Sequence, residues 1–495
     1  MKKIVIAGGG VSGLTAGIYA QKAGYQAVIC EKNAVPGGEC TGWDREGYHI
    51  DNCIHWMMGT SGKSALHDIW KETGALGTRP VHHMDAMYTS RLRGEAITLW
   101  KDVGRTQREL LTLSPEDARE IGRLIAGVRL ARNITIPADM PGELMRPFDL
   151  LKLAASSANA LRVFRRYAGM DTADLAARFR HPLIRAVLTD FCPKESMASA
   201  FPMAYGNFVG GDGGIPAGGS RAMAERMRVR FTQLGGRWQP NAEAEKLCLQ
   251  GERAISLLLK SGEQVEGDYF ILACDPDVTF SRLLGPQYMD AVFREVYAQR
   301  AAYPVYGMFQ AAYAVESACD AVGGDVILDC GELVDETWLS GRMSVKSYAY
   351  EPSFSPPGRQ LVQVLWGLTE DAYDVWTALY EKDRAAYHVR KAALAARAQA
   401  KIEENFPAWR GKLRLLDSWT PVTYRRFCNA YKGYNQAFTV TKHSRKDPYP
   451  SPYITGVKNA VLAGQWLSPP GGLPGAAIQG KFSVQRIIHL ARGEG

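Results

Sequence analysis

The chain opens with a short run of β-branched residues at 4–7, which predicts a buried strand. A glycine-rich turn follows it. The apolar, alanine-rich stretch from Val11 to about Ala23 is typical of a helix, with Gly24 as its C-cap. A second apolar run, residues 26–30, ends at Glu31. The hydrophobic pattern therefore predicts a strand, a tight turn, a helix and a second strand at the start of the chain.

Later segments continue to alternate between helical and strand-like periods. Residues 105–200 predict a mostly helical region, in which Ser114 and Pro115 mark the start of one helix. Further elements are expected in this order: a helix at 221–234, strands near 238–247, 254–259 and 269–273, a helix near 384–404, a strand at 459–463 and a helix that runs through Ile488.

The composition is that of a globular protein with several hydrophobic cores. The chain has 495 residues, 46% hydrophobic and 22% charged, which suggests roughly three domain-sized units. Lys and Arg number 59 against 51 Asp and Glu, a formal net charge of +8. This surplus is too dilute to indicate nucleic-acid binding, and no run of about 18 consecutive apolar residues predicts a membrane-spanning helix.

The cysteines indicate a reducing compartment. They number nine, are scattered along the chain and form no CxxC pair, so neither a disulfide framework nor a metal site is predicted. Lys2 and Lys3 before an apolar stretch imitate a signal peptide, but that stretch contains glycines spaced for another purpose. We therefore expect a cytoplasmic protein.

One segment bears on membrane association. Residues 150–170 contain Lys152, Arg162, Arg165 and Arg166 but no Asp or Glu. One interpretation is a basic amphipathic helix that rests on anionic lipid and makes the protein peripheral to the membrane. The other is an ordinary solvated helix on the surface of a domain. The sequence favours neither.

The glycine turn carries the strongest motif. Gly8, Gly10 and Gly13 form a GxGxxG pattern between the predicted strand and helix. The first glycine permits the sharp turn, the second leaves room for a pyrophosphate, and the third lets the helix pack closely on the strand. The helix N-terminus then offers free N–H groups and a positive dipole end to the phosphates.

The residues after the second strand indicate which dinucleotide binds. Glu31 can accept hydrogen bonds from ribose hydroxyls, and its charge would repel a 2′-phosphate. The Gly37-Gly38 pair that follows is similar to the FAD-binding branch of two-dinucleotide-binding-domain flavoproteins. No second strand-linked GxGxxG follows, which argues against a separate NAD(P)H domain.

Several motifs, in this order, resemble phytoene-desaturase-like flavoproteins, a group that includes carotenoid desaturases, carotenoid isomerases and all-trans-retinol saturases. They are the N-terminal GGGVSGLTAG, the middle GIPAGGSRAMAERM, the strand YFILACDP and the terminal LAGQWLSPPGGLPGAAIQG. YHIDNCIHWMMG and SWTPVTYRRF resemble the saturase-like branch in particular. Two residues depart from the family pattern, because Cys53 stands where glycine is more common and Glu39 where a basic residue is common.

The resemblance implies an α/β fold. It consists of a discontinuous, Rossmann-like FAD-binding domain of the two-dinucleotide-binding type, with an inserted α+β substrate domain and a helical cap. The FAD-binding domain is expected from residues 1–80, 205–285 and 455–495, the substrate domain from 81–104 and 286–454, and the cap, with its open question of membrane contact, from 105–200.

The resemblance also implies non-covalent FAD and assigns residues to it. These are Gly8, Gly10, Val11, Ser12 and Gly13 at the pyrophosphate, Glu31 and Lys32 at the adenosine ribose, Gly37, Gly38 and Glu39 in the loop beneath the flavin, Ala244 near adenine, and Gly464, Gly475, Ala476 and Ala477 at the flavin.

Candidates for the chemistry lie in the aromatic stretch at 39–60 and near the C-terminus. His55 is a candidate for proton transfer because the ordinary pKa of histidine lies near working pH, and a structural role is the alternative. Asp51 either orients His55 or caps the hairpin. Trp56, Tyr424 and Trp466 are expected to line an apolar substrate pocket.

These observations predict an FAD-dependent oxidoreductase that acts on C–C or C=C bonds of an apolar isoprenoid or lipid. Saturase, desaturase and isomerase activity all stay open, and so does the electron donor or acceptor. One alternative is a flavin amine oxidase. Another is a lipid-binding escort of the GDP-dissociation-inhibitor type, which uses no flavin.

Overall fold

A computed structural model describes residues 1–62, 64–317, 319–331, 335 and 337–493. Its organising element is a five-stranded parallel sheet of strand order β10-β2-β1-β14-β20. The strands come from three distant parts of the chain: β1 (Lys3–Ala7), β2 (Gln26–Cys30), β10 (Arg237–Gln239), β14 (Tyr269–Leu272) and β20 (Ala460–Leu462).

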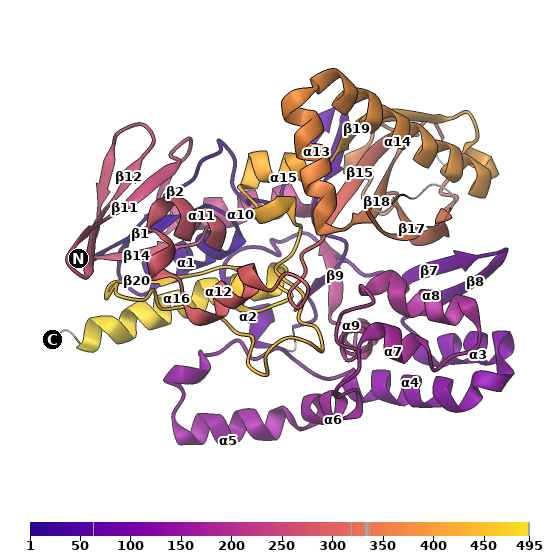
Figure 1. The fold of residues 1–495 in the computed structure, drawn as a ribbon, viewed down its shortest axis with the longest axis horizontal. Helices are drawn as coiled ribbons and strands as arrows, with labels where there is room; N and C mark the ends of the chain where they lie inside the picture. Colours follow the sequence, from indigo (N-terminus) through magenta and orange to yellow (C-terminus); the bar gives the residue numbers. More distant parts are fainter. Residues whose placement is uncertain (63, 318, 332–334, 336, 494–495) are drawn as a thin grey trace.

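Alternating side chains of this sheet pack against two different layers. Ile4 and Ile6 face a helical layer formed by α1 (Val11–Lys22), α10 (Gly219–Gln233) and α16 (Leu473–Gly493). Val5 and Ala7 face the opposite layer. This second layer contains the antiparallel strands β11 (Ala244–Gln250), β12 (Arg253–Leu259) and β13 (Gln264–Glu266) (Figure 1). The sheet is thus buried on both faces, as parallel sheets generally are.

A second, seven-stranded sheet of order β19-β15-β18-β17-β16-β7-β8 lies beside the first. Helices α13 (Glu370–Lys382) and α14 (Arg384–Asn405) cover one of its faces (Figure 1). Its strands are β7 (Ala86–Leu92), β8 (Glu95–Trp100), β15 (Gly307–Val315), β16 (Asp325–Asp329), β17 (Trp338–Ser347), β18 (Gln360–Leu368) and β19 (Leu413–Trp419).

Most of the region between β8 and α10 is helical, and it shares a hydrophobic core with β7 and β8 of the large sheet. It contains α3 (Val103–Leu113), α4 (Ala118–Ala131), α5 (Pro147–Ser156), α6 (Ala158–Arg166), α7 (Thr172–Ala176), α8 (Pro182–Phe191) and α9 (Ala200–Val209). A buried ion pair joins this cap to the large sheet, with Arg342 Nε 2.7 Å from Asp190 Oδ1. The side chain of Asp190 is fully buried, so loss of either partner would leave an uncompensated charge.

A hairpin and several short elements connect these layers. The hairpin consists of β3 (Gly42–Arg45) and β4 (Tyr48–Asp51). Other short elements include β5 (Met57–Met58), α2 (Ala65–Glu72), β6 (Val81–His82), β9 (Gly213–Pro216), α11 (Pro276–Val278), α12 (Ala291–Ala298) and α15 (Pro421–Cys428).

The α/β fold class is confirmed, and two local predictions are corrected. The single helix considered over residues 150–170 is two helices, α5 and α6, because the chain leaves helical geometry at Ser157. Pro115 begins a short 3₁₀ turn, and α4 starts only at Ala118. Ser114 therefore does not cap α4, and its hydroxyl donates to Asp117 Oδ2 at 2.9 Å. The domain boundaries themselves stay a prediction.

Helix α5 is unusual because none of its residues is buried. In Figure 1 it runs along the lower edge of the molecule, away from both sheets. Among the described residues, no helix is both long enough and apolar enough to cross a membrane.

Candidate flavin site

The glycine turn between β1 and α1 is built around two close backbone approaches. Gly8 has φ +104°, a conformation that favours glycine, and a Cβ on Gly13 would lie only 1.9 Å from the Gly8 carbonyl oxygen. A Cβ on Gly10 would meet only Gly37 O, at 3.8 Å, among the described atoms. Gly13 therefore serves helix packing, whereas Gly10 leaves space above the turn.

Polar groups lie where a pyrophosphate would need them. Val11 and Ser12 occupy the first turn of α1, whose N–H groups have no partner within the helix. Ser12 is buried, and its hydroxyl has no hydrogen-bond partner among the described residues. A buried hydroxyl without a partner is costly, and a bound phosphate oxygen would satisfy it.

The Gly37-Gly38 loop closes the other side of the turn. Gly37 N donates to Gly9 O at 2.9 Å, and a Cβ on Gly38 would lie 3.5 Å from Gly10 Cα. Gly37 and Gly38 have φ values of +109° and +61°. These contacts bring the loop of residues 37–39 directly against the glycine turn of residues 8–13, the phosphate turn. Its position beneath a flavin stays a prediction.

Glu31 lies at the end of β2 and is 5% exposed. Its Oε2 accepts from Gly9 N at 2.7 Å, and its Oε1 accepts from the backbone N–H of Asn33 at 2.8 Å. Burial raises the pKa of this carboxyl, while the hydrogen bonds from Asn33 and Gly9 oppose that rise. The side-chain amide of Asn33 also donates to Oε1, at 3.0 Å, so Oε1 already accepts two hydrogen bonds. Oε2 keeps a second accepting site, and a ribose hydroxyl can bind there.

The two other adenosine candidates differ in their positions. Ala244 begins β11, close to Glu31, because Ala242 N donates to Glu31 O at 2.7 Å. Lys32 is tied to α15 instead: its ammonium donates to Arg426 O at 2.8 Å and to Asn429 Oδ1 at 3.0 Å. A contact between Lys32 and the adenosine stays a prediction.

The C-terminal motif returns to the same place in space. Gly464 follows β20 with φ +140°, and Gly475, Ala476 and Ala477 lie in the first turns of α16. A Cβ on Gly480 would lie 2.4 Å from Ser12 O, so α16 packs directly on α1 beside the phosphate turn. Residues that are far apart in the chain therefore border one site.

Two acidic side chains, Glu39 and Asp275, lie at this site, and within the described part of the chain no cation pairs with either of them. Burial, followed by the charge of Asp275, raises the pKa of Glu39 to about 8. Burial likewise raises the pKa of Asp275 to about 7. Asp275 Oδ2 accepts from Tyr431 N at 2.8 Å, and Asp275 Oδ1 from Asp277 N at 2.8 Å. Near neutral pH this pair can both hold and release a proton.

Asp51 is an anchor for the hairpin. Its Oδ2 accepts from Ser220 N and its Oδ1 from Ser220 Oγ, each at 2.6 Å. Oδ1 also accepts from Cys53 N at 3.1 Å. None of the hydrogen bonds found among the described residues joins Asp51 to the His55 ring, so the capping interpretation of Asp51 is the one the contacts support.

His55 is held neutral, contrary to the reason for which it was a proton-transfer candidate. Burial, followed by the charge of the nearby Lys346 ammonium, lowers its pKa to about 3. Lys346 Nζ donates to His55 O at 3.0 Å and lies 3.7 Å from Asp325 Oδ2. At neutral pH the imidazole therefore lacks the second ring proton that it would need to act as an acid. It offers one N–H donor and one acceptor nitrogen.

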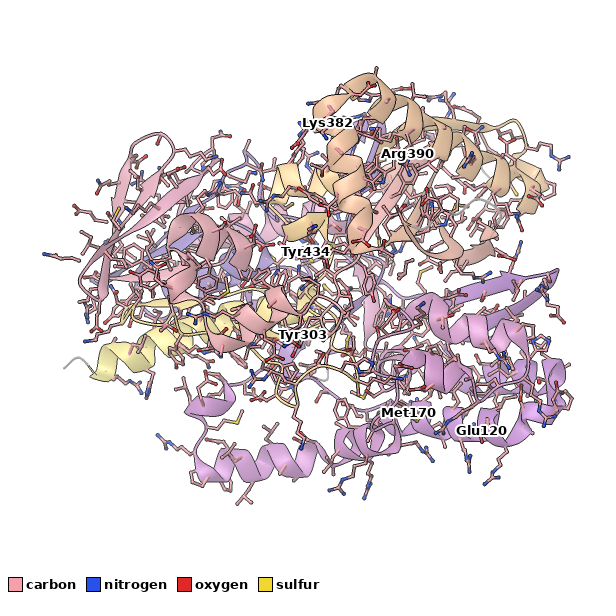
Figure 2. The ribbon with its side chains drawn as sticks, in the orientation of Figure 1. Glu120, Met170, Tyr303, Lys382, Arg390 and Tyr434 are labelled. Carbon is pink, nitrogen blue, oxygen red and sulfur yellow. The ribbon has the colours of Figure 1, made fainter. Side chains whose placement is uncertain are left out.

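The three predicted aromatic wall residues occupy separate places. Trp56 packs edge-on against Phe208 of α9, with ring centroids 6.2 Å apart. Tyr424 on α15 is 4% exposed, and its hydroxyl donates to Asn52 Oδ1 at 3.1 Å. Trp466 is 3% exposed and packs edge-on against Tyr434, with ring centroids 5.0 Å apart. Figure 2 labels Tyr434 near the centre of the molecule.

A family model described as flavin containing amine oxidoreductase matches residues 11–488. The match extends from the phosphate turn to the last helix. The chain belongs to the flavin-containing amine oxidoreductase family. The residues described above fit this assignment. This protein is therefore an FAD-dependent oxidoreductase.

Two carotenoid enzymes are similar to this chain over much of its length, at low sequence identity. A prolycopene isomerase of Arabidopsis thaliana is 23% identical over 454 residues, covering 87% of the chain and 73% of that protein. The zeta-carotene-forming phytoene desaturase of Myxococcus xanthus is 23% identical over 513 residues, covering 100% of the chain and 95% of that protein.

Solved structures confirm the fold of this family member. An oxidoreductase from Methanosarcina mazei has a TM-score of 0.59 at 15% identity and covers 98% of the chain and 100% of its own. Cyclohexylamine oxidase from Brevibacterium oxydans IH-35A has a TM-score of 0.57 at 14% identity, with 100% coverage of both chains. At these identities the likeness concerns the fold alone.

Sequence reasoning missed Asp275 and Lys346. Asp275 belongs to the quoted YFILACDP motif, and its place after a buried strand beside β1 was the available signal. Lys346 carried no such signal, since only the packing of β17 against the loop after β4 brings it to His55. Among the described residues, no group of three or more His, Cys, Asp or Glu side chains is arranged to hold a metal ion.

Replacing Gly10 with leucine should abolish FAD retention while the protein stays folded. The side chain would fill the space above the turn that the pyrophosphate requires, and a Cβ there meets no atom closer than 3.8 Å in the described structure. The measurement is the flavin content of the purified protein, with circular dichroism as the check on folding. Gly122→Leu, at a position where a Cβ meets no atom within 4 Å, is the matched control. A Gly10→Leu protein that retains FAD would contradict the pyrophosphate assignment.

The affinity for FAD should fall as pH rises past 8. Glu39, with a pKa raised to about 8, is neutral below that pH and negative above it, beside a diphosphate of the same sign. The dissociation constant should then increase by at most about tenfold per pH unit. A Glu39→Gln variant should lose this dependence, and Glu266→Gln, an exposed carboxylate on β13, should keep it. Fluorescence titration with FAD between about pH 6 and about pH 9.5 measures both. An unchanged pH profile in Glu39→Gln would contradict this role.

Proposed function

We propose that this FAD-dependent oxidoreductase acts on carbon–carbon double bonds, or on bonds that become double, in an apolar isoprenoid or lipid. The observation that carries the proposal is the similarity to prolycopene isomerases and phytoene desaturases over most or all of the chain. The glycine turn, with open space above Gly10, supports it as the proposed cradle for FAD. Aromatic residues near the cradle, such as Trp466 and Tyr424, suit an apolar substrate.

The chain's own residues would divide the work of binding and proton handling. Bound FAD supplies hydride transfer at its ring. The phosphate turn and Glu31 would fix the cofactor, and the N-terminus of α16 would favour negative charge on its reduced form. His55 would present a neutral polar point in an apolar wall. Glu39 and Asp275 have pKa values matched to proton exchange near pH 7–8.

The direction of the reaction is tested by single-turnover spectroscopy. Oxidised holoenzyme is mixed anaerobically with partly saturated isoprenoids, and reduced holoenzyme with polyenes, including a poly-cis form and a retinoid. We expect at least one of three responses. They are flavin bleaching in the first experiment, flavin reoxidation in the second, and isomerisation of the poly-cis polyene. A parallel set of primary amines serves as the comparison. Bleaching by an amine with release of hydrogen peroxide, and no response to any isoprenoid, would overturn the proposal in favour of an amine oxidase.

We further propose that α5 and α6 place the protein on an anionic membrane, from which an apolar substrate can be taken. Phe148 and Leu151 on α5 are 64% and 69% exposed, and Phe164 on α6 is 52% exposed. The exposed basic side chains Arg146, Lys152, Arg162, Arg165 and Arg166 border these apolar residues. Apolar side chains that insert and cations that bind lipid phosphates are the two components of interfacial binding.

Vesicle sedimentation measures this association. Binding should require anionic lipid and weaken with salt, because each Lys or Arg near such a surface contributes about 1 kcal/mol that salt screens. The double variant Phe148→Ser, Leu151→Ser should lose binding. Val389→Ser, which removes a 70% exposed side chain on α14, should not. Equal binding by wild type and the double variant would contradict the membrane role.

A further inference from the structure

The loop of residues 37–39, the flavin loop, leads into the hairpin β3–β4. This hairpin brings two cysteines, Cys40 and Cys53, opposite each other. In the β3–β4 ladder Gly42 pairs with Asp51, and the pairing continues with a hydrogen bond from Asn52 N to Thr41 O at 3.0 Å. One step further, the same register sets Cys40 opposite Cys53. These two residues are distant from each other in the sequence, and only the antiparallel turn of the hairpin makes them neighbours.

Cys40 and Cys53 lie just beyond the paired ends of β3 and β4, next to the hydrogen bond between Asn52 and Thr41. Neither amide bonds across the pair, since Cys40 N donates to Gly37 O at 3.1 Å and Cys53 N donates to Asp51 Oδ1 at 3.1 Å. The register of β3–β4, continued beyond the strands, would make them a non-hydrogen-bonded antiparallel pair. In regular pairs of this kind the Cα atoms lie about 4.5 Å apart and the side chains share one face. A disulfide requires a Cα separation of about 4.4–6.8 Å.

Both residues are free thiols in this structure. The pKa of the Cys53 thiol lies well above its usual range, first because of its hydrogen bond to the Cys40 side chain and then because of burial. Cys40 is 2% exposed, and its Sγ lies 3.6 Å from Ser220 O. Cys40 is therefore shielded from thiols in solution, while Cys53 is half-buried.

The flavin loop is the neighbouring element inside the protein. Cys40 follows Gly38 by two residues, and Gly38 lies against Gly10 of the phosphate turn. Cys53 is close enough to Glu39 for that carboxyl to contribute to the raised pKa of the Cys53 thiol. Glu39 belongs to the same loop. Both cysteines thus border the place assigned to FAD.

We propose that Cys40 and Cys53 form a redox-active dithiol that exchanges two electrons with bound FAD. In the forward direction both S–H bonds break and one S–S bond forms. The two electrons and two protons released reduce FAD to its dihydro form. In the reverse direction the disulfide accepts the same two electrons and two protons from the dihydro form. The pair gives the enzyme a second place to hold an electron pair while substrate and external electron partner exchange. The proposal rests on FAD binding and not on the identity of the substrate.

Reductive titration and peptide mapping of the holoenzyme test the proposal. Holoenzyme oxidised by molecular oxygen is titrated anaerobically with dithionite. Wild type should take up two electrons beyond the pair that FAD itself accepts, and Cys53→Ser should take up only the FAD pair. Differential alkylation followed by mass spectrometry should find a Cys40–Cys53 disulfide in the oxidised form and two alkylated thiols in the reduced form. Cys319→Ser, which alters an exposed cysteine outside the hairpin, should behave as wild type.

Two further measurements keep the result interpretable. The peptide mapping uses wild-type protein, so it tests the proposal even if the Cys53→Ser variant misfolds. Alkylation of both cysteines in the oxidised holoenzyme would overturn it. Apoprotein stripped of FAD and exposed to the same oxygen should keep both thiols. A disulfide formed there at the same rate would also overturn the flavin coupling. None of these readouts uses a substrate, so they are independent of any failure of the proposed substrate class.

Discussion

The close approach of the backbone at the glycine turn is the constraint on which the structure depends. Gly13 lies against the carbonyl of Gly8, and Gly480 of α16 lies against the carbonyl of Ser12, so the first and last helices and the first strand meet with almost no side chain between them. Glycine alone permits these distances. The open space above Gly10 and the partnerless hydroxyl of Ser12, among the described residues, are consequences of that packing, and both suit a pyrophosphate.

The hairpin β3–β4 links the glycine turn to the seven-stranded sheet. Asp51 anchors it to the start of α10 through Ser220, and Gln363 of β18 donates to Asp51 O at 2.9 Å. Lys346 of β17 donates to His55 O in the following loop. A few buried or partly buried polar contacts thus fix the seven-stranded sheet relative to the loop of residues 37–39.

The electrostatics of the interior follow from burial rather than from the formal charge of the chain. A net charge of +8 would suggest a basic site, yet the carboxyls of Glu39 and Asp275 lie at the flavin loop with raised pKa values. His55, expected to titrate near neutrality, is held uncharged by burial and by Lys346. Desolvation acts on each group locally, and a sum over the sequence contains no information about it.

The sequence by itself determined the local elements and the cofactor motif, because strand–turn–helix patterns and glycine spacing depend on neighbours in the chain. Thus β2 spans residues 26–30 as predicted, and Gly8, Gly10 and Gly13 form the turn assigned to them. Only the tertiary structure decided that Asp51 anchors the hairpin, that Lys346 reaches His55, and that Lys32 is bound to α15. These roles depend on which distant strands and helices pack together and on how much water that packing excludes. Residue types and their spacing do not encode those two quantities.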